Sequence, residues 1–247
     1  MEKLFFVSFL VGFFFIILEN IFPKRSVSKK KQLNSYKTNI LVFTFNNVIF
    51  YILILRTLYF FAQNYSQYGL FNFLPEGLFK FIFLLIFLDL IIYFWHRANH
   101  EFSYLWLFHK THHSDISLNT TTAIRFHIGE LFLSLLVKVT IIVIFGIPAN
   151  VILVSESLTT VFSFFHHSNI SFKLEKKLSK VIIVPFLHEV HHSSKRIEHD
   201  SNYGVIFSFW DKIFRTQRLS IKNPIGLDGV KELDFLKFIK FGFTKKY

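Results

Sequence analysis

Residues 78–100 read LFKFIFLLIFLDLIIYFWHRANH, an apolar segment that runs directly into the histidines His96 and His100. The apolar part, from Leu78 to Trp95, is close to the roughly 20 residues that a helix needs to cross a bilayer. Histidines four residues apart lie on one face of a helix, so both imidazoles are directed toward the same place. The segment therefore predicts a membrane-spanning helix that ends in candidate metal ligands.

Three further groups of histidines follow: HKTHH at 109–113, HH at 166–167 and HEVHH at 188–192. An isolated histidine is best explained as a hydrogen-bonded structural residue, and we keep that interpretation for His127 and His199. Clustered imidazoles beside apolar helices need a compensating interaction, and metal coordination supplies one. All the groups fall on the same predicted side of the membrane, although long apolar stretches separate them.

The number of histidines predicts two metal ions. A structural zinc takes about four ligands, whereas the three boxes HRANH, HKTHH and HEVHH offer eight histidines and His167 makes nine. The chain has no cysteine, so its metal ligands must be nitrogen or oxygen. Imidazole sites with open coordination positions suit iron, although imidazole also binds zinc and copper.

Two other functions fit parts of this pattern. HEVHH contains the HExxH motif of zinc metallopeptidases, with His188, Glu189 and His192, but that function leaves His191 and the other boxes unexplained. A non-enzymatic membrane protein that binds or transports metal would place ligands along a path through the bilayer. The histidines here gather at one end, which favours an enzyme.

The segments before Leu78 set the predicted topology. Leu4 to Phe22 is expected to be a retained anchor because it has no small-residue cleavage site. The five cations between residues 24 and 31 place its far end in the cytoplasm by the positive-inside rule. Ile40 to Ala62 returns outward, and the helix that begins at Leu78 comes back. Everything from His96 onward therefore begins on the cytoplasmic side.

Two further apolar stretches, Leu131–Ile147 and Val151–Phe165, predict a helical hairpin that turns at Pro148. Each arm is slightly shorter than a full span. Lys138 and Glu156 stand at similar depths in the two arms, and an unpaired charge in a bilayer is costly. We therefore expect these two side chains to form an ion pair.

The sequence thus predicts an all-α integral membrane protein. It has three transmembrane helices, a helical membrane hairpin and a cytoplasmic histidine-rich helical cap that holds a dinuclear metal site. Residues 1–77 are expected to form the membrane anchor helices and loops, residues 78–217 the catalytic domain, and residues 218–247 a C-terminal cytoplasmic tail.

The composition agrees with a membrane protein. The chain is 52% apolar and 19% aromatic, which is high for a soluble domain of this size. Its net charge is +12, but the basic residues flank apolar segments, so they fit an anionic membrane surface better than nucleic acid. The richness in Lys, Ile, Phe and Asn suggests an AT-rich genome and a bacterial inner membrane.

The ordered boxes resemble the fatty acid hydroxylase and sterol desaturase superfamily of membrane di-iron enzymes. The resemblance runs from about Asp89 to Gln217, through DLIIYFWHRANH, LWLFHKTHHS, FFHHSNI, PFLHEVHHS and DSNYGVIFSFWDKIFRT. It implies that the metal ligands are His96, His100, His109, His112, His113, His167, His188, His191 and His192. Glu189, where relatives commonly have a basic residue, and Arg215, where they usually have glycine, depart from the pattern without removing a ligand.

The resemblance also implies the reaction: two iron ions, which zinc can replace in preparations, use O2 to hydroxylate or desaturate a lipid C–H bond. The chain has no dinucleotide-binding fingerprint and no cysteine for an iron–sulfur cluster. Electrons must therefore come from a separate donor such as a ferredoxin or a small cytochrome. Fatty acyl, sterol, sphingolipid and carotenoid substrates all stay open, as do hydroxylation, desaturation and ether-lipid monooxygenation.

One carboxylate is expected to support the histidines. Asp89 lies seven residues before His96, about two turns along the same helix face. Because a carboxylate in an apolar stretch is costly and usually functional, we expect it to accept a hydrogen bond from a ligand imidazole; the alternative is a carboxylate that caps a neighbouring helix. Asp200, Asn202 and Tyr203 in DSNYG either play a similar part or form a plain turn.

Overall fold

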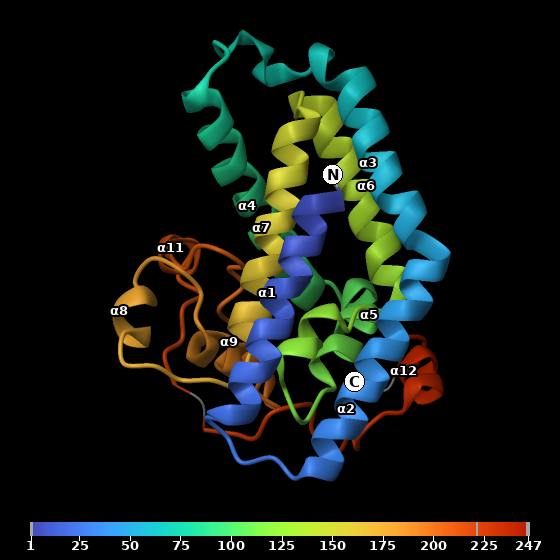
Figure 1. Cartoon of the computed structure of the whole chain (residues 1–247), viewed down its shortest axis with the longest axis vertical. Helices are drawn as coiled ribbons and strands as arrows, with labels where there is room; N and C mark the ends of the chain where they lie inside the picture. The colour runs from blue at the N-terminus through green and yellow to red at the C-terminus, as the bar shows by residue number, and fades with distance from the viewer. Residues whose placement is uncertain (1, 221, 246–247) are drawn as a thin grey trace.

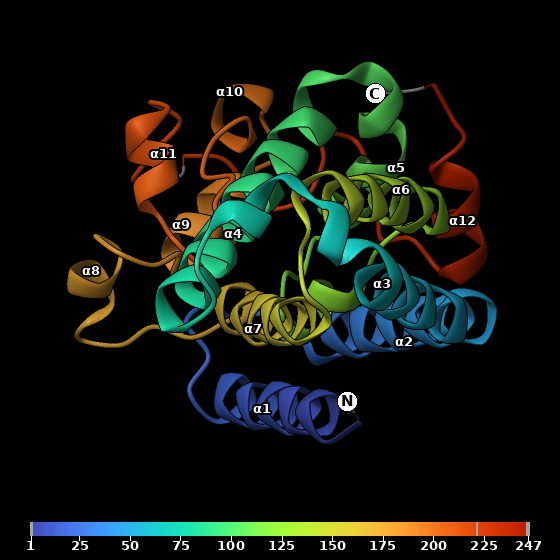
Figure 2. The same cartoon turned by 90° about the horizontal axis from the view of Figure 1, so that it is seen from above.

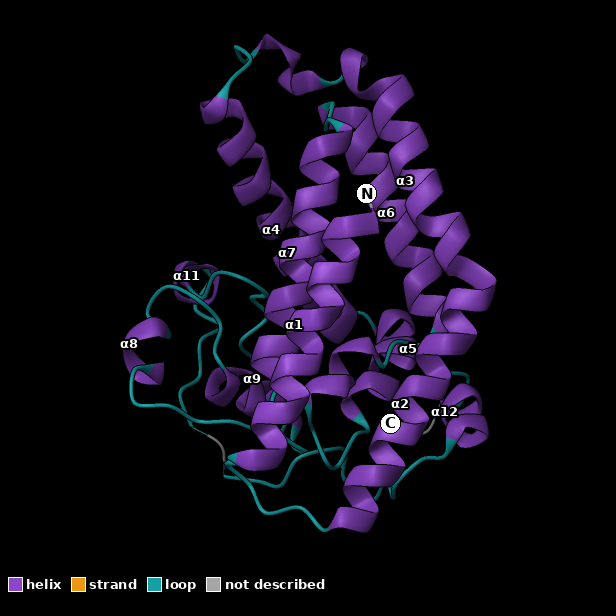
Figure 3. Ribbon diagram, in the orientation of Figure 1, coloured by secondary structure: helices purple, strands orange, loops and turns teal. Residues whose placement is uncertain are grey.

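A computed structural model describes residues 2–220 and 222–245, and this part of the chain is helical, with two isolated bridges and no β-strand (Figure 3). The long helices run roughly along the long axis of the molecule, and the short helices and loops gather around one end of them (Figure 1). The long helices are α1 (Glu2–Ile21), α2 (Lys29–Asn46), α3 (Ile52–Tyr65), α4 (Leu78–Glu101), α6 (Ile128–Phe145) and α7 (Ala149–His167).

Within the described residues, two helices, α4 and α6, are long and apolar enough to cross a membrane, and Phe6–Ile21 of α1 is a shorter apolar helix. The outward side of α1 carries large apolar side chains, among them Phe6 and Phe13, which are 65% and 61% exposed. Such a surface suits a lipid environment better than water. The number of spans and their orientation stay predictions.

The predicted segment from Ile40 to Ala62 is part of a longer, interrupted helix. It begins at Lys29, where the Ser28 hydroxyl accepts a hydrogen bond from the backbone N–H of Lys31, a typical N-cap. Between α2 and α3 lies a π-helical turn, Asn47–Tyr51. The Asn47 side chain donates to the carbonyl of Phe43 at 2.8 Å, and a side chain that takes a backbone acceptor loosens the regular ladder.

The predicted hairpin is present as α6 and α7. Gly146 ends α6 with φ +73°, and a Cβ at this position would lie 2.5 Å from the carbonyl oxygen of Ser66, so glycine is required by both conformation and space. The expected ion pair is confirmed, since Lys138 Nζ lies 2.7 Å from Glu156 Oε1. Seen from above, α7 lies between α1 and α4, and α3 lies beside α6 (Figure 2).

The first helix is fastened to the short helices. It packs along α7 and leads to Lys24 and Arg25, which both form ion pairs with Glu189 of α9 (Pro185–His191). The backbone N–H of Lys24 also donates to the carbonyl of Asn169 at 2.9 Å. Because these contacts join the start of the chain to residues near 170 and 190, α1 covers the histidine-bearing region.

The segment predicted as a C-terminal tail also packs on the helices. Its helix α12 (Phe235–Phe241) contacts α2 and α5 (Ser103–His113). The ring of Phe238 is fully buried, and the guanidinium of Arg125 lies over it at 4.8 Å. Residues 221, 246 and 247 of this segment lie outside the described residues.

Candidate metal centre

Four elements bring the histidines to one end of the long helices. His96 and His100 stand on the last turns of α4, and α5 begins immediately afterwards, because Phe102 leaves the helical conformation. The end of α7 carries His167. The helix α9, which begins with Pro185 in its first position, packs on α7 and supplies the last box. Proline is favoured there because its missing N–H is not needed.

The nine predicted ligands fall into two groups, and within each group the candidate ligand atoms lie within 4.8 Å of one another. The first group is His96, His100, His109, His113 and His191, and the second group is His112, His167, His188 and His192. All nine side chains are buried or nearly so, with at most 9% exposed. The structure thus brings together every residue that the sequence indicated as a ligand.

Two of the helices serve both groups. On α5, His109 and His113 belong to the first group and His112 to the second. In the last box His191 belongs to the first group, whereas His188 and His192 belong to the second. Residues four apart share a helix face while neighbours point about 100° apart. The doubled histidines in HKTHH and HEVHH therefore allow one helix to contribute to two adjacent sites.

In the first group, hydrogen-bond acceptors of the protein hold most of the rings through Nδ1. The Nδ1 atoms of three ligands lie near acceptors of the DSNYG loop: His96 at 2.8 Å from the Tyr203 carbonyl, His191 at 2.7 Å from the Ser201 carbonyl, and His100 at 3.2 Å from the Asp200 carboxylate. His109 Nδ1 lies 2.9 Å from Glu130 Oε1. Each of these contacts leaves Nε2 free for a metal.

The second group is arranged around its Nε2 atoms. These lie 3.1 Å apart between His112 and His167, 2.9 Å between His167 and His188, and 3.2 Å between His188 and His192. Two nitrogens bound to one metal at about 2.0–2.1 Å are about 2.9–3.4 Å apart. In a neutral imidazole, Nε2 carries either one proton or one lone pair, so it can make one hydrogen bond. The two middle atoms of this series, on His167 and His188, would each need two, so hydrogen bonds alone cannot explain all three contacts. The spacing fits a shared metal ion.

In the first group, buried nitrogens without a hydrogen-bond partner also indicate a metal site. His100 Nε2 and His191 Nε2 are buried and have no hydrogen-bond partner in the protein. A buried polar atom without a partner is costly, and a metal would satisfy both. Burial, followed by the neighbouring histidines, holds the pKa of His113 and His192 well below the ordinary histidine value. The rings are therefore neutral, which is the form that binds metal.

A buried polar network anchors the end of α5. The carboxylate of Asp115 accepts hydrogen bonds from Ser35 at 2.7 Å and from Thr122 at 2.8 Å, and Arg125 donates to the carbonyl of Thr111 at 3.1 Å. Burial alone would raise the pKa of Asp115, but the charge of Arg125 and these hydrogen bonds lower it. The network connects α2 to the last turn of α5, where His112 and His113 stand.

The predicted role of Asp89 needs correction. Its carboxylate accepts hydrogen bonds from the backbone N–H groups of Ile206 at 3.2 Å and Phe207 at 3.4 Å and from the indole of Trp210 at 2.8 Å, and not from a ligand imidazole. Sequence spacing placed Asp89 on the same helix face as His96. The loop that returns from Tyr203 lies nearer to it and has backbone donors that need acceptors.

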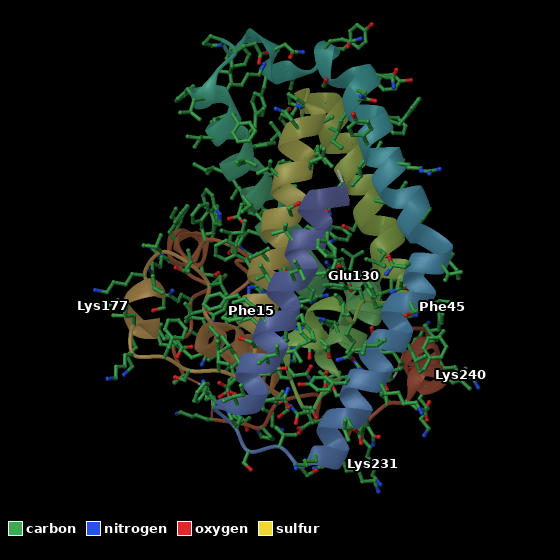
Figure 4. The ribbon with its side chains drawn as sticks, in the orientation of Figure 1. Phe15, Phe45, Glu130, Lys177, Lys231 and Lys240 are labelled. Atoms are coloured by element: carbon green, nitrogen blue, oxygen red, sulfur yellow. The ribbon has the colours of Figure 1, made fainter. Side chains whose placement is uncertain are left out.

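The carboxylates that do contact histidines of the two groups are Glu130 and Asp200. Sequence reasoning missed Glu130 because a glutamate in the first turn of an apolar helix is also what the helix dipole favours. In the DSNYG segment, Asp200 and the Tyr203 carbonyl contact His100 and His96, which supports the predicted role for these two residues. Asn202 instead donates to the carbonyls of Leu187 and Arg218. In Figure 4, Glu130 lies in the interior, where the long helices meet the short ones.

The remaining histidines lie outside both groups. His127 caps α6 and its Nε2 lies 3.1 Å from the Ile239 carbonyl, so the structural interpretation holds. His199 Nδ1 lies 2.9 Å from the Ser193 carbonyl, and its ring stacks on Trp106. His166, which was not predicted as a ligand, is buried with Nδ1 at 3.2 Å from the Val205 carbonyl.

A cavity of about 320 Å³ opens beside the two groups. Histidines of both groups line one end of it, and apolar side chains such as Phe43, Ile92 and Phe164 line its walls. Ser134 and Thr160 add hydroxyl groups, and Lys138 and Glu156 lie deeper between α6 and α7. A largely apolar cavity with a few polar groups is typical of a small-molecule site.

Glu189 does not face the metal groups in the way that a peptidase would require. Its carboxylate pairs with Lys24 and Arg25, while His188 and His192 on either side of it point to the second group. A general base must reach the water at the metal. Glu189 instead fastens α1 to α9, which removes the main support for a metallopeptidase.

The family model for fatty acid hydroxylase matches residues 81–216, more than half of the 247 residues. The chain belongs to this family. The matched region contains all nine histidines of the two groups, together with Glu130, Asp200 and the loop that binds Asp89.

Three curated proteins illustrate what the chain is similar to. Alkylglycerol monooxygenase of Caenorhabditis elegans is 35% identical over 136 residues, which is 55% of this chain and 26% of that protein. Ornithine lipid hydroxylase of Rhizobium tropici is 27% identical, over 68% of this chain and 51% of its own. Human lathosterol oxidase is 29% identical, over 66% of this chain and 53% of its own.

The matches cover only about a quarter to a third of the alkylglycerol monooxygenases from worm and human. No solved structure matches the chain.

Proposed function

We propose that this protein is a membrane oxygenase that uses O2 and externally supplied electrons to hydroxylate or desaturate a C–H bond of a lipid. One observation carries the proposal: two adjacent groups of five and four histidines stand at one end of a largely apolar cavity. The family membership supports it, because relatives in this family are named as a monooxygenase, a hydroxylase and an oxidase of lipids.

The nine histidines would hold two iron ions, five at the first group and four at the second. All-nitrogen ligand sets suit iron that must keep coordination positions open. Such a pair, when bound, supplies the oxidising chemistry that attacks an unactivated C–H bond. Iron is proposed over zinc on the strength of the resemblance to di-iron enzymes, and zinc remains able to fill the same nitrogen sites.

The chain's own residues have two tasks in this reaction. The carbonyls of Ser201 and Tyr203 and the carboxylates of Glu130 and Asp200 hold the first-group rings in one orientation. The cavity walls, including Phe43 and Phe164, place a lipid chain beside the histidines and exclude water. Fixed geometry of this kind favours reaction at one carbon over its neighbours.

The protein is proposed to sit in the membrane with the histidine groups on the cytoplasmic side, where an electron donor can approach. Exposed lysines surround α8 (Glu175–Leu178), namely Lys173, Lys176, Lys177 and Lys180, and Lys177 points outward in Figure 4. A basic surface attracts an acidic partner and speeds its association. A ferredoxin or small cytochrome with an acidic face is the expected donor.

The substrate is proposed to be a lipid with an alkyl or acyl chain. Relatives are named for alkylglycerols, ornithine lipids and lathosterol, and a narrow cavity between helices suits an extended chain. The discriminating experiment is lipid profiling of a deletion strain against its parent, followed by turnover of the purified protein with a chemical reductant. We expect an O2-dependent product with one added oxygen or one added double bond. Product formation without O2 would contradict the proposal.

A further inference from the structure

The cavity beside the histidines ends at a wall. A second, smaller cavity of about 20 Å³ lies between α3, α4, α6 and α7, lined by apolar residues such as Leu58, Leu88, Ile141 and Ile152. Three residues line both cavities: Ile92, Lys138 and Glu156. They therefore form the partition between the two spaces.

The ion pair is the central part of this partition. Lys138 Nζ lies 2.7 and 2.8 Å from the two carboxylate oxygens of Glu156, so the two side chains join α6 and α7 across the space between them. They are 30% and 21% exposed, and part of that exposed surface lines the cavities. A methylene chain passing this point would have to separate the two charges in an apolar setting, which is unfavourable.

The partition stands at a definite distance from Glu130, which contacts His109, and from His167. Lys138 lies eight residues beyond Glu130, and Glu156 lies eleven residues before His167, which correspond to about 12 and 16 Å along straight helices. An extended chain advances about 1.25 Å per carbon, as follows from the C–C bond length. The space between the histidines and the pair therefore accommodates roughly ten to thirteen carbons.

We propose that the Lys138–Glu156 ion pair closes the substrate cavity and determines how long a lipid chain can be beyond the reacting carbon. This inference rests on the proposed lipid oxygenase function and adds the specificity-determining residues. The apolar pocket beyond the pair would accept further carbons if the pair were absent. Ile141 lies three residues after Lys138 and Ile152 lies four residues before Glu156, and the volume that the two charged side chains occupy would be added to the small pocket between these isoleucines.

The test compares double variants that open or keep the partition. Lys138→Ala with Glu156→Ala removes both side chains and joins the cavities, and Lys138→Val with Glu156→Val opens them less while retaining apolar packing. Lys138→Met with Glu156→Gln keeps the volume, and the exchange Lys138→Glu with Glu156→Lys keeps volume and charge pairing. The readouts are the chain lengths of the lipids that co-purify with each protein, identified by mass spectrometry, and of the oxidised products.

We expect the alanine variant to shift both profiles to longer chains. The valine variant and the uncharged Lys138→Met, Glu156→Gln variant should shift them less, and the exchange variant should match the parent. An alanine or valine variant that folds but keeps the parental profiles would overturn the inference. If the alanine variant does not fold, the valine variant decides. Failure of the proposed function is distinguishable: the parent would then form no oxidised lipid, while a shift in the bound-lipid lengths of the alanine variant would still support the inference.

Discussion

The two histidine groups differ in how their rings are held. In the first group, four of the five Nδ1 atoms have a protein partner, at His96, His100, His109 and His191. In the second group only His167 has one, the carbonyl of Ser163 at 2.8 Å. The Nδ1 atoms of His112, His188 and His192 are buried without a partner.

This difference indicates that the protein orients the first group before metal binds, whereas the second group depends on the metal itself. A hydrogen bond to the distal nitrogen fixes the ring and makes it a better ligand, and its loss typically costs 10–100-fold in metal affinity. The second group also has one histidine fewer. We therefore expect the two sites to differ in affinity and in their response to mutation.

The largest effects should follow removal of a ligand. His100→Ala in the first group and His188→Ala in the second should each reduce bound metal from two ions to one and lower activity by more than about 100-fold, beyond the loss of a second-sphere contact. Elemental analysis of the purified protein measures the metal content, and lipid product formation measures the activity. His127→Asn is the control, because His127 lies in neither group. Two metals retained in a ligand variant would show that the groups are misassigned.

A chelator titration tests the comparison directly. The second group should release its metal at an about 10–100-fold lower chelator concentration than the first, because three of its four rings have no hydrogen-bond partner at Nδ1. Metal content and product formation should be followed together as the chelator is increased. Release of both metals at the same chelator concentration would show that the difference in hydrogen bonding does not affect metal affinity.

Glu130→Gln should weaken the first group alone. The amide keeps the size of the side chain and an acceptor oxygen but removes the charge near His109 Nδ1, so we expect about a tenfold loss of metal affinity. Asp200→Asn should behave alike through His100. Metal titration monitored at each site checks this. A loss confined to the second group would refute the assignment of Glu130 to the first.

Asp89→Asn should affect folding more than metal binding. The new amide nitrogen would face donors from Trp210 or Ile206, and the lost hydrogen bond should lower the free energy of unfolding by about 1–3 kcal/mol. Thermal unfolding measures the effect. Trp210→Phe is the matched variant, because it removes the indole N–H that donates to the same carboxylate. A selective loss of metal from the first group, with stability unchanged, would restore the ligand-supporting role expected from the sequence.

The smallest effect is expected for Glu189→Gln. Its pairs with Lys24 and Arg25 are partly accessible to solvent, so the loss in stability should be about 1 kcal/mol or less. Metal content and lipid oxidation should persist. Complete loss of activity with both metals still bound would instead indicate a glutamate that acts in catalysis, as in a metallopeptidase.

The sequence was sufficient to predict the clustered histidines and the long apolar helices. Spacings of three and four residues in HRANH, HKTHH and HEVHH indicated the ligands, and the helices α4, α6 and α7 follow the apolar runs. It could not show how neighbouring histidines divide between two groups, because that division depends on the packing of α9 against α7 and of α5 against α4.

The sequence also could not predict contacts between segments that are far apart in the chain. Asp89 was assigned to an imidazole on its own helix, whereas its partners lie 117 to 121 residues away. Glu130 reaches His109 from the start of the next long helix. In contrast, the pairing of Lys138 with Glu156 was predictable, since one short turn fixes the relative depth of residues in the two arms.

The long separation of the ligands has a consequence for biosynthesis. The first group is not complete until His191 has been made, 95 residues after His96, and the carbonyls that orient it extend to Tyr203. At about 5–20 residues per second, a ribosome needs roughly 5–20 seconds to cover that distance. Under the proposed function, metal loading would follow synthesis of the whole histidine-bearing region, and the ions available in the cell at that moment would decide which metal enters.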